Sequence, residues 1–171
     1  MALEARLRTE SLGTNVPLAR LRKMVAFDRL LARMGADQAD RWLLKGGLAL
    51  QVRMLEGART TKDIDVLLRE SGADAHRLLV EASKLDLSDW FVFEFGLPQP
   101  LTDQAGLRVP VRCRLDSREF ESFHVDMEWA IRSWPKQSRS WSRTSWSSPV
   151  FCQRRCGVIR WRSTSLRRFT H

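Results

Sequence analysis

Two adjacent glycines, Gly46 and Gly47, stand between a short apolar run and a segment with helical character. Residues 42–45 are predicted as a strand, and residues 48–55 (LALQVRML) carry the helical pattern. Glycine lets the backbone turn tightly and approach a ligand, and the free N–H groups at the start of a helix attract anions. Such a turn is also a common plain connection. The pair therefore predicts a strand–turn–helix unit and leaves its ligand open.

A second feature is the carboxylate pair Asp63 and Asp65, separated by Ile64. In a strand, alternate side chains share one face, so both carboxylates project together from positions about 6.6 Å apart. Two carboxylates on one face repel each other unless a cation or a proton lies between them. Magnesium needs few protein carboxylates, because phosphates and water supply the rest of its shell. The alternative for an isolated pair of this kind is a solvated strand face.

A third carboxylate, Asp126, lies in the segment His124–Glu128, where apolar and polar residues alternate. If this segment is a strand beside residues 63–68, Asp126 completes a cluster of three carboxylates. The alternation alone is equally compatible with an edge strand that has one wet face.

These features are more specific in combination than separately. Sixteen positions separate Gly47 from Asp63, which leaves room for a short helix and a return loop. Such a helix would bring an anion-binding turn back beside the carboxylates, as a transferase acting on a nucleoside triphosphate requires. Lys45, Thr61 and Lys62 flank the two motifs and are candidate phosphate ligands, although a polar loop with a solvated lysine is the plain alternative.

The rest of the chain supplies a frame for this unit. The elements expected in order are a helix over 17–34 ended by Gly35, the strand 42–45, the helix 48–55, the strand 63–68, a helix over 73–85, a strand over 90–95, and a hairpin of 109–115 with 120–127 around Asp116-Ser117. We therefore expect an α+β fold in which helices flank a mixed β-sheet.

Composition excludes several classes of protein. No apolar run is long enough to cross a membrane, and the charged start MALEARLRTE is not a secretory signal. The three cysteines lack the paired spacing of a zinc site and favour the reducing cytoplasm. Of the 29 basic residues, ten follow residue 128, whereas all 20 acidic residues precede it, so that residues 1–128 hold 19 basic and 20 acidic side chains. The net charge of +9 therefore belongs to the last 43 residues.

The segment LLKGGLALQVRMLEGARTTKDIDVLL resembles the signature of the AbiEii/AbiGii-type toxin nucleotidyltransferases, within the DNA polymerase β-like nucleotidyltransferase superfamily. The resemblance extends from about residue 18 to residue 128 and includes FDRLLARM and FHVDM. Leu48 departs from it, because many superfamily members have a small hydroxyl residue there.

The resemblance implies a nucleotidyltransferase-like sheet and Mg²⁺-dependent transfer of a nucleotide from a nucleoside triphosphate to an RNA. The acceptor used by some members is the 3′ end of tRNA, and a cognate antitoxin is the implied protein partner. Carried over, the pattern assigns catalysis and metal binding to Asp63, Asp65 and Asp126. It assigns nucleotide binding to Gly46 and Gly47, which Lys45, Thr61 and Lys62 would assist.

The last part of the chain, residues 129–171, does not resemble the family. Such toxins continue into a helical half with an A-E-K-x-H-A-like stretch, whereas this segment is rich in Arg, Ser and Trp and has no acidic residue. We therefore expect two regions, a nucleotidyltransferase-like domain over 1–128 and a poorly ordered tail produced by a shifted reading frame, which would leave the chain weakly active or inactive. The alternative is a genuine basic arm that binds RNA, or a non-catalytic remnant that binds an antitoxin.

Overall fold

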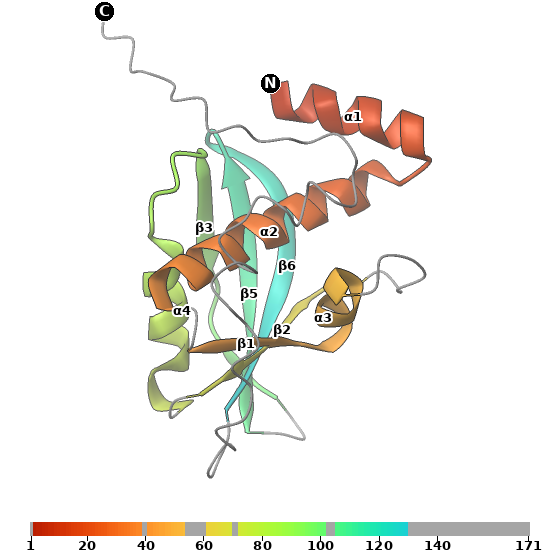
Figure 1. Cartoon of the computed structure of the whole chain (residues 1–171). Coiled ribbons are helices and arrows are strands. Elements are labelled where there is room, and N and C mark those ends of the chain that lie inside the picture. The colour runs from red at the N-terminus through yellow and green to blue at the C-terminus, as the bar shows by residue number, and fades with distance from the viewer. Residues whose placement is uncertain (1, 39–40, 54–60, 70–71, 102–104, 130–171) are drawn as a thin grey trace, which may run out of the picture.

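The computed structural model describes residues 2–38, 41–53, 61–69, 72–101 and 105–129. Its helical elements are α1 (Ala2–Thr14), α2 (Leu18–Gln38), α3 (Gly46–Arg53), the single 3₁₀ turn η1 (Gly72–Asp74) and α4 (Ala75–Ser83). Its strands are β1 (Trp42–Lys45), β2 (Ile64–Leu68), β3 (Phe91–Phe95), β4 (Gln99–Pro100), β5 (Gly106–Leu115) and β6 (Arg118–Trp129). The expected α+β architecture with a mixed sheet is confirmed (Figure 1).

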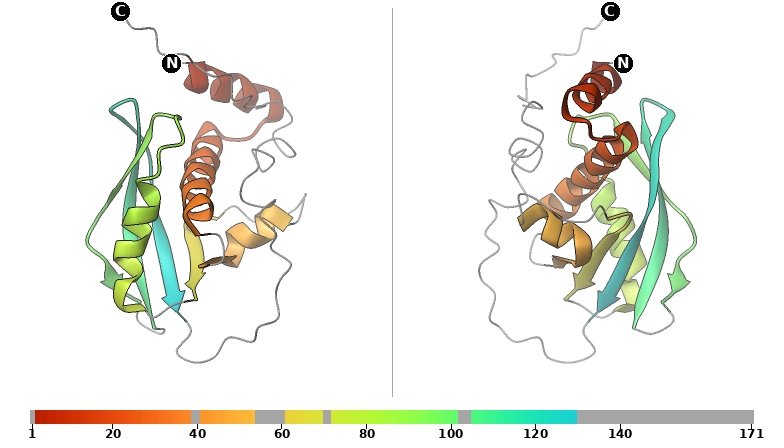
Figure 2. Two further views of the ribbon diagram at one scale, coloured as in Figure 1. Left: turned by 60° about the vertical axis from the view of Figure 1, so that its left-hand side comes forward. Right: turned by 90° about the vertical axis from the view of Figure 1, so that its right-hand side faces the viewer.

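The strands form one sheet in the order β1-β2-β6-β5-β3, with β4 attached to β5. All pairs are antiparallel except β2 with β6, which run parallel. Helices α2 and α4 pack against one face of this sheet (Figures 1 and 2). Strand residues alternate accordingly, with apolar side chains toward the helices and charged ones on the opposite, open face.

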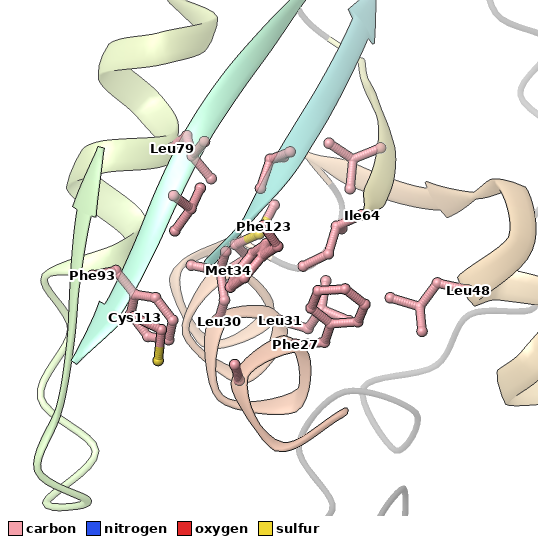
Figure 3. Packing of buried hydrophobic residues seen from close by; sticks show 14 of the residues in the cluster. Phe27, Leu30, Leu31, Met34, Leu48, Ile64, Leu79, Phe93, Cys113 and Phe123 are labelled. Atoms are coloured by element: carbon pink, nitrogen blue, oxygen red, sulfur yellow. The ribbon is translucent and has the colours of Figure 1, made fainter. Parts of the chain in front are cut away.

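The core lies between α2 and the sheet. Phe27, Leu30 and Met34 on α2 are almost completely buried and face Ile64 and Phe123 on the strands (Figure 3). The rings of Phe27 and Phe123 meet edge to face with centroids 4.9 Å apart.

The expected end of helix α2 at Gly35 is wrong, since α2 continues to Gln38. Packing of the preceding turn outweighs the modest cost of one glycine inside a helix.

Two elements, helix α1 and strand β4, were not expected from the sequence. Helix α1 has a weak apolar stripe, and Leu3 and Leu7 bury it in the core. An ion pair between Glu4 and Arg22, 2.7 Å long, joins it to α2. Strand β4 has only two residues and ends in Pro100, which gives almost no periodicity to detect.

The hairpin of β5 and β6 is longer than expected and turns at Asp116-Ser117 as predicted. Both turn residues have positive φ, 47° and 66°, as in the two-residue turns that match the twist of paired strands. A register shift between Cys113 and Arg114 interrupts the pairing. It inserts Phe120 as an extra residue in β6, so that Phe120 and Phe123 are both buried although they are three positions apart.

Candidate active site

A row of four charged residues crosses the open face of the sheet. Lys45 on β1 is the register partner of Asp65 on β2, and Asp65 is the register partner of Asp126 on β6. Asp126 in turn lies opposite Arg108 on β5. Neighbouring strands are about 4.8 Å apart, so the carboxylates of Asp65 and Asp126 occupy adjacent positions on this face. The expectation that the strand with Asp126 lies beside the strand with Asp65 is confirmed.

The glycine turn lies directly on this row. Gly46 has a φ of 67°, in the left-handed region that favours glycine. A Cβ atom at this position would lie 2.1 Å from Oδ2 of Asp65. Any side chain would therefore collide with the carboxylate. The turn and the Asp65 carboxylate are in contact, as the combined motif predicts.

The second glycine contacts the segment that leads into β2. A Cβ atom on Gly47 would lie 3.3 Å from Cβ of Thr61, and the Thr61 hydroxyl donates a hydrogen bond of 3.0 Å to the Asp63 carbonyl. Lys62 is exposed beside it, whereas Leu48 is 1% exposed and belongs to the core (Figure 3). Thr61 thus joins the glycine turn to the carboxylate pair.

Asp63 precedes β2 rather than belonging to it, since the strand begins at Ile64. Its Oδ1 lies 3.3 Å from Nδ1 of His124 and 3.4 Å from the backbone nitrogen of the same residue, which donates to it. His124 and Asp126 share a face of β6, so Asp63 is held at the same side of the sheet as the other two carboxylates. His124 was not singled out in the sequence, although its alternation with Asp126 placed it on that face.

Arg108 is a further site residue that the sequence did not indicate. Its Nε donates to Oδ1 of Asp126 over 2.8 Å, and its Nη2 donates to Oδ2 over 2.7 Å. Asp126 is 9% exposed, so this two-point ion pair neutralises a carboxylate that is nearly withdrawn from water. Regular pairing outward from the hairpin turn would place Leu107 opposite Asp126. The shift at Cys113 and Arg114 brings Arg108 there instead.

The sequence pattern of one known protein family matches this chain. The family is described as "Nucleotidyl transferase AbiEii toxin, Type IV TA system", and the match covers residues 29–139, about two thirds of the chain. The chain belongs to this family. The match includes the glycine turn, Asp63, Asp65 and Asp126, which lie together in the structure.

A solved structure gives the same fold for the AbiEii-family chain. MenT4, a nucleotidyltransferase toxin from Mycobacterium tuberculosis H37Rv, superposes with a TM-score of 0.51 at 20% sequence identity. The superposition covers 75% of this chain and 44% of MenT4, so the chain spans less than half of that toxin's length. The comparison with curated proteins finds no match. Within the described residues, no helix has the length and apolarity needed to cross a membrane.

Electrostatics in the AbiEii-family site favour a bound cation. Burial raises the pKa of Asp65, the nearby charge of Asp126 raises it further, and Lys45 lowers it. Lys45 forms an ion pair with Glu128 on β6, and its charge also acts on Asp65. Hydrogen bonds and the charge of Asp126 raise the pKa of Arg108, which stays cationic. The carboxylates of the site, on Asp63, Asp65, Asp126 and Glu128, therefore outnumber its two cations, Lys45 and Arg108, and a bound cation would neutralise the remaining charge.

The donor set suits a hard divalent ion. Among the described residues, no three His, Cys, Asp or Glu side chains converge as a ready-made metal cage. Asp63 and Asp65 supply two carboxylates, and Asp126 on the adjacent strand is the third, although both of its oxygens accept hydrogen bonds from Arg108. Mg²⁺ is held by one or two carboxylates together with substrate phosphates and water. The residues therefore fit Mg²⁺ that arrives with a triphosphate.

Proposed function

We propose that the chain is a nucleotidyltransferase toxin that transfers a nucleotide from a nucleoside triphosphate to an RNA in the cytoplasm, with the 3′ end of tRNA as acceptor. A cognate antitoxin is its protein partner. The observation that carries this proposal is the contact of the Gly46 turn with Asp65, in register with Asp126. A turn whose backbone can bind phosphate, next to paired carboxylates, supports the proposal because triphosphate chemistry requires both.

The three aspartates have roles in this reaction. Asp63, Asp65 and Asp126 would hold Mg²⁺, which would neutralise charge on the triphosphate and stabilise the charge that develops during transfer. Asp126 orients the attacking 3′-hydroxyl and accepts its proton. The oxygen forms a bond to the α-phosphorus as the bond from that phosphorus to the β-phosphate oxygen breaks, and pyrophosphate leaves.

Phosphate binding is assigned to the turn around Gly46 and Gly47. The N–H groups at the start of α3 are the natural donors to phosphate oxygens. Lys62 is exposed beside Thr61 and can reach into solvent toward a phosphate. Lys45 contributes charge from within the site, where it also pairs with Glu128.

We further propose that residues 1–128 form the nucleotidyltransferase-like unit and that the tail over 129–171 comes from a shifted reading frame. The tail lies almost wholly outside the described residues, so the structure does not bear on it, and the family match extends to residue 139, across the first eleven residues of the tail. The composition of the tail, with no acidic residue, is what supports the shift. Sequencing the gene checks the tail, because an intact frame with the same tail in related genes contradicts the shift.

The proposed activity is tested by incubating the protein, its reading frame restored, with each α-labelled nucleoside triphosphate, Mg²⁺ and total tRNA, and the unrestored chain serves as the weakly active or inactive comparison. Label should enter RNA with one preferred nucleotide and should disappear with EDTA. The contrary result is salt-sensitive RNA binding without metal-dependent nucleotide binding, lost when residues 129–171 are removed. That pattern identifies a non-catalytic module that binds through its basic tail.

A further inference from the structure

Arg108 has no role in the reaction as described, although it occupies a central position. Its guanidinium donates hydrogen bonds of 2.8 and 2.7 Å to the two carboxylate oxygens of Asp126. The Asp126 side chain is 13% exposed, whereas that of Arg108 is 42% exposed. The carboxylate is therefore fixed in the sheet, and the guanidinium approaches it from the solvent side.

This ion pair conflicts with the use of Asp126 in catalysis. A carboxylate held at both oxygens by an arginine fork is neither a free metal ligand nor a free base for a hydroxyl group. The guanidinium and a divalent ion also repel each other if both remain on the same carboxylate. Asp126 therefore has to lose Arg108 before it can act on a substrate.

Arg108 has a second possible partner of the right chemistry. The planar fork of arginine matches phosphate as well as carboxylate, with two parallel hydrogen bonds in each case. Asp63 and Asp65, the residues assigned to the metal-bound triphosphate, are close enough for their charges to act on Arg108. A triphosphate held there presents anionic oxygens on the same open face of the sheet.

We propose that Arg108 is a positioning residue that exchanges partners, holding Asp126 in the empty enzyme and passing to the triphosphate when the metal–nucleotide complex binds. This inference rests on the proposed function. It makes metal binding depend on the triphosphate, because the metal alone must displace Arg108 without offering it a new anion. Coupling of this kind between two ligands typically amounts to about 5–150-fold in affinity.

The test compares the full chain with Arg108→Gln, using Mn²⁺ as a paramagnetic substitute for Mg²⁺. Two probes are titrated, Mn²⁺ alone and the Mn²⁺ complex of inorganic triphosphate, which carries the feature that all nucleoside triphosphates share. We expect Arg108→Gln to bind Mn²⁺ alone about 10-fold more tightly. It should bind the triphosphate complex no more tightly than the unchanged chain, because the contact of the guanidinium with phosphate is lost.

Arg112→Gln is the matched control. Arg112 lies on the same strand and the same face, is 60% exposed and pairs with Glu94 and Glu119, away from the carboxylate row. Its replacement should leave both affinities unchanged. Asp126→Asn added to Arg108→Gln should remove the gain for Mn²⁺ alone. If Arg108→Gln does not fold, Arg108→Lys replaces it. It should show the same crossover, tighter binding of Mn²⁺ alone without tighter binding of the triphosphate complex, but with a smaller change because one ammonium replaces the two-point fork.

Two outcomes contradict the proposal: Arg108→Gln lowers the affinities for both probes equally, or it leaves the affinity for Mn²⁺ alone unchanged. Either result overturns the exchange, because a structural contact alone produces no crossover. The proposed function stands in that case if the unchanged chain still binds the triphosphate complex through Asp65. If no variant binds the complex in a manner that depends on Asp65, both inferences fail.

Discussion

Replacing Asp65 by Asn is expected to reduce metal-dependent nucleotide binding and transfer by at least about 100-fold, because residues that merely support a metal ligand already contribute about 10–100-fold. The same change should raise the melting temperature of the metal-free protein. Burial and the charge of Asp126 both oppose ionisation of Asp65. Neutralising this side chain therefore removes an unfavourable charge from the fold. Titration with Mn²⁺-nucleotide and thermal melting measure the two effects.

The pH dependence follows from the direction of the Asp65 shift. The pKa of Asp65 is raised above its ordinary value of 3.8, so the folded protein binds this proton more tightly than the unfolded chain does. The destabilisation by the ionised carboxylate is absent below that ordinary value and develops as the pH rises through the raised pKa. The melting advantage of Asp65→Asn should therefore grow from acid to neutral pH, while metal affinity of the unchanged chain grows over the same range.

Asp74→Asn serves as the control for Asp65→Asn. Asp74 is an exposed carboxylate in an ion pair with Arg77 at the start of α4, so its replacement should change neither nucleotide binding nor the pH profile. A functional carboxylate and a structural one are distinguished by these two measurements together. If Asp65→Asn lowers the melting temperature and leaves nucleotide binding intact, Asp65 is part of the framework and the proposed metal site is wrong.

Replacing Gly46 by Ala is expected to abolish nucleotide binding and to destabilise the fold. A left-handed backbone costs a residue with a Cβ atom about 1–2 kcal/mol, and the new atom would lie 2.1 Å from Oδ2 of Asp65. Either the carboxylate rotates away from its place in the row or the turn moves off β2. Both movements separate the phosphate-binding turn from the metal-binding carboxylates. Chemical denaturation measures the loss of stability, and titration with Mn²⁺-nucleotide measures the loss of the site.

Gly13→Ala gives a matched comparison for Gly46→Ala. Gly13 lies inside α1, and a Cβ atom added there meets nothing within 4 Å. Alanine is favoured over glycine inside a helix by about 0.5–1 kcal/mol, so this variant should be at least as stable as the unchanged chain and should bind nucleotide equally well. Equal behaviour of the two alanine variants would contradict the close approach of Gly46 to Asp65.

Local sequence patterns were sufficient for much of this fold. The alternation in residues 63–68, the helical stripe after Pro17 and the turn at Asp116-Ser117 gave elements that the structure confirms. Their signals are local because side-chain direction repeats with a fixed period in a strand or a helix. Helix α1 escaped prediction because Leu3 and Leu7 pack against distant residues of the core, which its own composition does not reveal. The first residues of α2 past Gly35 are exposed and extend a helix whose last buried residue is Met34.

The glycine pair and the three aspartates were identified from the sequence alone, since their residue types and spacing already carry the chemistry of a phosphate turn and a cation site. Their assembly was decided by tertiary structure. Parallel pairing of β2 with β6 placed Asp65 beside Asp126 across 61 positions of chain. Insertion of Phe120 as a bulged residue moved Arg108, in place of Leu107, opposite Asp126. No local pattern encodes that one-residue shift, because it depends on burying Phe123 against α2 and Phe120 against β3. The same shift brings Arg108 to the position where it holds the Asp126 carboxylate.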